Sequence, residues 1–67
     1  MNVTINGAAT EVAEGTKVAD LADRFAGTRR TGIAIARNGE VVPKSRWPEE
    51  PVGEGDRFEV LSAIGGG

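Results

Sequence analysis

The sequence contains no cysteine and no histidine among its 67 residues. Without cysteine the chain can form no disulfide, and it offers no thiol as a metal ligand or as a nucleophile. Without histidine it lacks the side chain that most often serves as a general base or binds a metal. The chain therefore fits a hydrolase poorly, because it can form no Ser–His or Cys–His pair.

Long apolar runs are missing too. No apolar stretch approaches the roughly 20 residues that a membrane-spanning helix needs, and no signal-like segment is present. The net charge of −2 gives no support for the basic face that a nucleic-acid binder presents. We therefore expect a soluble cytoplasmic protein whose partners include neither a membrane nor a nucleic acid.

The length of the chain limits what it can build. A chain of this size buries only about 60% of its unfolded surface, which leaves little room for a deep enzyme pocket. Its 39% hydrophobic and 27% charged residues are typical of a globular protein rather than a disordered one. We expect a single domain over residues 1–67, of which residues 64–67 form a flexible C-terminal tail.

The first residues predict a β-hairpin. Met1, Val3 and Ile5 alternate with polar residues, as in a half-buried strand. Asn6-Gly7 then fits a type I′ turn, in which both central residues need positive φ. This turn fixes the register on the core face. The expected pairs are Ile5 with Ala8, Val3 with Thr10 and Met1 with Val12.

A second hairpin is predicted over residues 33–42, around Asn38-Gly39. Its register pairs Ile35 with Val42, Ala36 with Val41, and Arg37 with Glu40. We expect the last pair to be a favourable cross-strand charge pair. The core face then holds Ile33, Ile35 and Val42. The opposite face holds an apolar patch formed by Ala34, Ala36 and Val41.

One helix is predicted between the two hairpins. Its apolar residues recur at i, i+3, i+4 and i+7 and form one stripe, made of Val18, Leu21, Ala22 and Phe25. Thr16 is the expected N-cap, and Gly27 suits the position that ends the helix. We expect this helix to pack on the face of the sheet that carries Val3 and Ile5.

The rest of the chain predicts a short turn and one more strand. Pro43 should end the second hairpin because it cannot donate to a ladder, and Trp47 should cover the small core. The last strand runs over residues 57–62, with Phe58 inward and Leu61 outward. The order is β-β-α-β-β-β, which makes an α+β fold: a mixed sheet of about five strands with one main helix across it.

The printed sequence closes on Gly65, Gly66 and Gly67. Glycine has no Cβ, so such a stem can adopt positive φ and enter a narrow slot. We expect the tail to present the α-carboxylate of Gly67 as the covalent site of the protein. The alternative is an idle, frayed end, which is common at chain termini.

These features resemble the ThiS sulfur carriers of thiamine biosynthesis, which have the ubiquitin-like β-grasp fold. The resemblance lies in AIARNGEVVPKSRW at residues 34–47, in Glu14-Gly15-Thr16 before the helix, in Gly55-Asp56 before the last strand, and in Gly66-Gly67. It covers the whole chain. The sequence departs from the usual pattern in its third glycine, Gly65, and in the modest size of Leu61 and Ala63, which bears on affinity for partners rather than on chemistry.

The resemblance implies a carrier and not an enzyme. A ThiF-like adenylyltransferase would use Mg-ATP to convert the carboxylate of Gly67 to an acyl-adenylate. A persulfide, usually from a cysteine desulfurase, would replace the nucleotide and leave a thiocarboxylate. A ThiG-like thiazole synthase would then take up the sulfur. Every catalytic group belongs to these partners, and the chain itself is expected to bind no cofactor and no metal.

The resemblance also implies a docking surface. Ile64 would be the last side chain able to hold the tail in a partner's channel. The outward residues of three strands would form the docking face, namely Leu61, Ala63, Ala34, Ala36 and Val41. The alternative is that these are scattered apolar surface residues, which are normal in folded proteins.

Three other functions stay open at this point. A MoaD-like carrier for molybdopterin synthesis would share the fold and the tail, and would differ in the acceptor of the sulfur. A ubiquitin-like modifier would be joined through Gly67 to lysines of other proteins. A non-covalent binding module would leave the tail idle. A free thiocarboxylate would support a carrier, and lysine conjugates would support a modifier.

Overall fold

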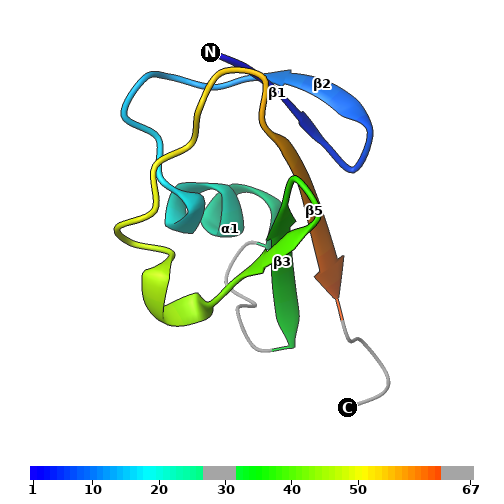
Figure 1. Ribbon diagram of the computed structural model, residues 1–67, viewed down its shortest axis with the longest axis vertical. Helices are drawn as coiled ribbons and strands as arrows, with labels where there is room; N and C mark the ends of the chain where they lie inside the picture. Colours follow the sequence, from blue (N-terminus) through cyan, green and yellow to red (C-terminus); the bar gives the residue numbers. More distant parts are fainter. Residues whose placement is uncertain (27–31, 63–67) are drawn as a thin grey trace.

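A computed structural model describes residues 1–26 and 32–62 of the chain, in which one helix packs against a five-stranded sheet (Figure 1). The strands are β1 (Asn2–Ile5), β2 (Ala8–Glu11), β3 (Ile33–Arg37), β4 (Glu40–Val42) and β5 (Arg57–Ser62). The helices are α1 (Val18–Ala26) and a single 3₁₀ turn, η1 (Lys44–Arg46). The α+β fold expected from the sequence is therefore confirmed. Gly27 lies outside the described residues.

The last strand occupies the middle of the sheet. The strand order is β2-β1-β5-β3-β4, so β5 inserts between the two hairpins (Figure 1). It runs parallel to β1 and antiparallel to β3. Ser62, at the end of β5, lies opposite Ile33, the first residue of β3. The sheet is thus mixed, and the segment that follows Ser62 continues from its central strand.

Both hairpin turns have the predicted geometry. Asn6 and Gly7 have φ values of 51° and 84°, and Asn38 and Gly39 have values of 51° and 88°. Asparagine is among the few side chains that tolerate positive φ, and glycine adopts it at no cost. The pairing of Ile5 with Ala8 and of Ile35 with Val42 follows the predicted registers. Local turn chemistry therefore fixes which residues of each hairpin share a face.

The core lies between α1 and the inner face of the sheet. Its buried side chains are Val3, Ile5, Val12, Val18, Leu21, Ala22, Ile33, Ile35, Val42, Trp47, Val52 and Phe58. Trp47 is 3% exposed, and its Nε1 donates to the carbonyl of Val42 at 2.8 Å. The prediction that Trp47 covers the core is confirmed, and the one polar atom of its side chain has a hydrogen-bond partner.

Phe25 departs from the predicted helix stripe. It is 44% exposed, whereas Val18, Leu21 and Ala22 of the same stripe are buried. Phe25 belongs to the last turn of α1, beyond the buried cluster of side chains. The guanidinium of Arg24 lies 5.4 Å from the centre of its ring. Helical spacing predicts the direction of a side chain but not whether the sheet extends far enough to cover it.

Thr16 is not the N-cap of α1. Its hydroxyl donates backwards to the carbonyl of Ala13, and the helix begins two residues after it, at Val18. Two free amides of the first turn find distant backbone partners instead. The amide of Val18 donates to the carbonyl of Glu50 at 2.9 Å, and that of Ala19 donates to the carbonyl of Trp47 at 3.0 Å. A local hydroxyl cap is therefore not needed.

Candidate functional site

Four apolar side chains lie on the face of the sheet that α1 does not cover. Register places Ala34 opposite Leu61 and Ala36 opposite Val41, so they span three adjacent strands, β5, β3 and β4. Val41 is 71% exposed and Leu61 is 59% exposed. We call Ala34, Ala36, Val41 and Leu61 the outer patch. Large apolar groups exposed together on one face are typical of a surface that contacts another protein.

One residue of the outer patch differs from the sequence prediction. Ala36 was expected to be exposed but is half-buried, because its methyl group lies between the larger residues Val41 and Glu59 on the neighbouring strands. Glu59 is exposed on the same face and places a carboxylate beside the apolar residues. Alternation along β5 already predicted this outward direction, but the residue opposite Glu59 depends on how β5 pairs with β3.

The other predicted site residues continue from the end of β5. Ala63, Ile64, Gly65, Gly66 and Gly67 lie outside the described residues, so their roles stay predictions. What the structure establishes is the origin of this segment. It follows Ser62, the last residue of the central strand. Ser62 itself comes directly after Leu61 of the outer patch. The surface and the segment expected to carry the chemistry are therefore adjacent along the chain.

Sequence reasoning assigned Asn6 and Asn38 to turns alone. The structure shows that both side chains also bind the backbone of β5, at Val60 and at Arg57 respectively. Asparagine at the first central position of each turn was the available signal. It could not reveal these contacts, because the sequence pattern does not show which strand lies beside the turn.

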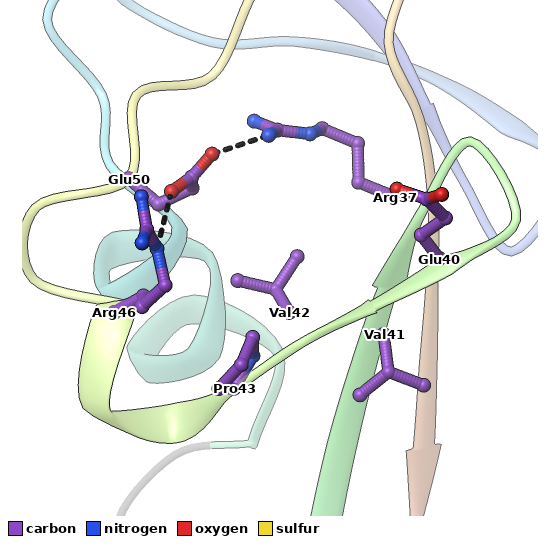
Figure 2. A pocket seen from close by; sticks show the side chains of 7 residues that line it. All are labelled: Arg37, Glu40, Val41, Val42, Pro43, Arg46 and Glu50. Atoms are coloured by element: carbon purple, nitrogen blue, oxygen red, sulfur yellow. Dashed lines mark hydrogen bonds and ion pairs between the residues drawn. The ribbon is translucent and has the colours of Figure 1, made fainter.

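A polar pocket of about 190 Å³ lies beside β4 and borders the outer patch at Val41 (Figure 2). The carboxylate of Glu50 lies there between the guanidinium groups of Arg37 and Arg46, and both form ion pairs with it. Arg37 also donates to the carbonyl of Pro51 at 2.8 Å. Arg37 lies opposite Glu40 as the predicted register requires. The predicted charge pair between them is wrong, because the Arg37 guanidinium pairs with Glu50 across the pocket instead.

The ion pairs lower the pKa of Glu50 below its ordinary value of 4.5. The hydrogen bond from Arg37 is the largest cause, partial burial opposes it, and Arg46 adds to the lowering. A carboxyl group whose pKa is lower in the folded protein stabilises the fold above its unfolded pKa. That contribution is lost as the pH falls through the folded pKa.

We expect Glu50→Gln to weaken the dependence of stability on acid. Between pH 7 and pH 3 the urea midpoint should fall less in this variant than in the wild type, and the two curves should converge at low pH. Glu49→Gln is the control, because Glu49 is exposed and has no ion pair among the described residues. Parallel curves for the wild type and Glu50→Gln would show that the pairs do not stabilise the fold.

Within residues 1–26 and 32–62, no group of three or more acidic, histidine or cysteine side chains is placed to hold a metal ion. No helix in the same ranges is long and apolar enough to cross a membrane.

Comparison with known proteins gives consistent matches along the whole chain. A model of the ThiS family matches residues 3–67. The sulfur carrier protein ThiS of Escherichia coli is 31% identical over 67 residues, which is the full length of both chains. A thiazole synthase of Paramagnetospirillum magneticum is 34% identical over 67 residues, and the chain spans 20% of the length of that relative.

A solved structure shows the same agreement in three dimensions. The crystal structure of a thiamine biosynthesis protein, ThiS, from Geobacter metallireducens matches with a TM-score of 0.82 and 32% sequence identity. The match covers 100% of both chains. The described sheet and helix are thus the ubiquitin-like β-grasp arrangement of that protein.

Proposed function

The chain belongs to the ThiS family, and from this membership we propose that it serves thiamine biosynthesis as a sulfur carrier whose working group is the α-carboxylate of Gly67. The observation that carries the proposal is the full-length match to the Escherichia coli sulfur carrier, with no part of either chain left over. The glycines at 65–67 supply the narrow stem that such a carboxylate needs.

The chemistry must begin with activation, because a carboxylate is a poor acyl electrophile. In the proposed first step, an oxygen of the Gly67 carboxylate attacks the α-phosphorus of Mg-ATP on a ThiF-like adenylyltransferase, and pyrophosphate leaves. A persulfide sulfur, supplied by a cysteine desulfurase or another donor, then attacks the acyl carbon and AMP leaves. A second thiol reduces the resulting S–S bond and frees the thiocarboxylate. This chain supplies only the carboxylate.

A ThiG-like thiazole synthase is the proposed acceptor of the sulfur. The similarity to a fifth of a thiazole synthase supports this choice over a molybdopterin acceptor. Recognition by both partners would use the outer patch, because it leads directly into the segment after Ser62. The opposite face is already filled by α1 and is not available for docking.

Intact-mass measurement tests the proposal. The purified protein is incubated with Mg-ATP, a ThiF-like adenylyltransferase and a persulfide source with a reducing thiol. The expected product is heavier by the replacement of one oxygen by sulfur, and it forms only when ATP is present. Transfer to lysines of other proteins, with no free thiocarboxylate, would support a ubiquitin-like modifier instead. No mass change under any of these conditions would refute the carrier.

Leu61→Glu tests the docking surface. The fold should be retained because Leu61 is 59% exposed, but affinity for the adenylyltransferase and the synthase should fall about tenfold to a hundredfold, the equivalent of burying one leucine. Calorimetry or surface binding measures this. Ala9→Glu is the control, since it adds the same charge to an exposed position of β2 on the same face. Equal affinities for wild type and Leu61→Glu would remove the outer patch from the proposal.

A further inference from the structure

The side chain of Asn6 forms two hydrogen bonds with the backbone of β5, of the kind that a residue of a neighbouring strand would form. Its Oδ1 accepts from the amide of Val60 at 2.9 Å, and its Nδ2 donates to the carbonyl of the same residue at 3.3 Å. The backbone amide of Asn6 also donates to the carbonyl of Phe58 at 2.9 Å. We call the two side-chain bonds the Asn6–Val60 pair.

The Asn6–Val60 pair takes the place of backbone pairing with β1 beyond Phe58, where β1 has already ended. β1 pairs with β5 only at Thr4 and Ile5, opposite Arg57 and Phe58. After Ile5 the chain turns away towards β2, whereas β5 continues to Ser62. An asparagine amide has a donor and an acceptor, as a backbone residue has. It can therefore extend the β1 side of the sheet by one position.

This contact lies at the base of the segment that carries Gly67. Val60 directly precedes Leu61 of the outer patch, and Ser62 is the last residue of β5. On the other side of β5, Val60 and Ser62 lie opposite Ile35 and Ile33 of β3. The end of β5 is thus held from both sides, and Asn6 supplies the contact on the β1 side.

We propose that Asn6 is a positioning residue for the carrier reaction: by holding Val60 it fixes where, and in which direction, the chain leaves the sheet towards Gly67. This inference rests on the proposed function. A partner that binds the outer patch then receives the segment after Ser62 from a fixed origin. Without the Asn6–Val60 pair, the end of β5 would be held by β3 alone and would have to be ordered on binding.

The expected effect is on binding rather than on the chemical step. Ordering the backbone of one residue on binding would weaken binding by about five- to thirtyfold, and the remaining pairing with β3 should keep the loss near the lower end. Such a loss is the same for bound substrate and transition state, so it raises KM and leaves kcat unchanged. A general loss of stability would not produce this division while the protein stays folded.

The chain provides its own matched control. Asn38 occupies the same position in the second Asn-Gly turn, has the same φ of 51°, and accepts from the amide of Arg57 at 2.9 Å. That contact is at the opposite end of β5 from Ser62. Asn6→Gly and Asn38→Gly each remove one side-chain amide that binds the backbone of β5. Both variants keep a residue that adopts positive φ freely at the turn.

The experiment compares adenylation kinetics of these variants on a ThiF-like adenylyltransferase with Mg-ATP. Asn6→Gly is expected to raise the KM for this protein about five- to tenfold at unchanged kcat, and to speed hydrogen exchange at the amide of Val60. Asn38→Gly is expected to change neither kinetic constant by more than about twofold. Thermal unfolding of both variants confirms that each is folded at the assay temperature.

Each outcome decides between the two proposals. If the wild type is not adenylated, the proposed function fails. If the wild type is adenylated but the two glycine variants raise KM equally or not at all, Asn6 is only a turn residue and this inference is overturned. Asn6→Asp covers a failure of Asn6→Gly to fold, because aspartate also tolerates positive φ. It keeps the acceptor for the Val60 amide but loses the donor and places a second carboxylate oxygen against the Val60 carbonyl, which weakens the pair. Its KM should lie above that of the wild type, and an unchanged KM would contradict the inference.

Discussion

A chain that ends at Gly66 is expected to gain neither a nucleotide nor sulfur, although it should fold as stably as a chain that ends at Gly67. Removal of one residue withdraws the terminal carboxylate by about 3.3–3.6 Å, the reach of one extended residue. A displacement of only about 1 Å can cost a hundredfold in the rate of an enzyme reaction. We therefore expect adenylation to fall by at least about a hundredfold.

The measurement is the intact-mass assay with a ThiF-like adenylyltransferase, Mg-ATP and a persulfide source, followed over time for both chains. A chain with one residue added after Gly67 is the complementary variant, because it converts the carboxylate of Gly67 to an amide. Urea unfolding should give the same midpoint for all three chains, since terminal residues generally contribute few contacts. Adenylation of the shortened chain at the wild-type rate would show that the adenylyltransferase does not depend on the length of the tail.

The features that sequence reasoning predicted correctly depend on neighbours in the chain. An Asn-Gly pair sets φ at two adjacent residues, and from there alternation sets the faces of both strands. That is how the partners of Ile5 and Ile35 could be named in advance. The same alternation placed Leu61 and Val41 of the outer patch outside the core.

The features that it missed depend on residues far apart in the sequence. Asn6 and Val60 are separated by 54 positions, and Arg37 and Glu50 by 13. The helix amides expected to bind Thr16 find the carbonyls of Glu50 and Trp47 instead. No local pattern indicates that β5 lies between the hairpins, yet this placement creates the Asn6–Val60 pair and sets the neighbours of Ala36 and Glu59.

Leu21→Ala is expected to bring the protein close to unfolding. Leu21 is 1% exposed and is among the largest fully buried side chains of the described residues. Replacing such a leucine by alanine leaves a cavity and costs about 2–5 kcal/mol. A domain of this size has a total stability of about 3–10 kcal/mol at the usual value per residue. One substitution therefore removes a large share of it.

Leu61→Ala is the matched control because it makes the same chemical change at a position that is 59% exposed. Its cost should stay within about 0.5 kcal/mol. Urea unfolding monitored by the fluorescence of the buried Trp47 measures both variants. If Leu21→Ala has no folded baseline, Leu21→Met keeps the side-chain volume and should cost less than about 1.5 kcal/mol. Equal shifts of the midpoint for Leu21→Ala and Leu61→Ala would contradict the placement of α1 on the sheet, because only that packing distinguishes the two leucines.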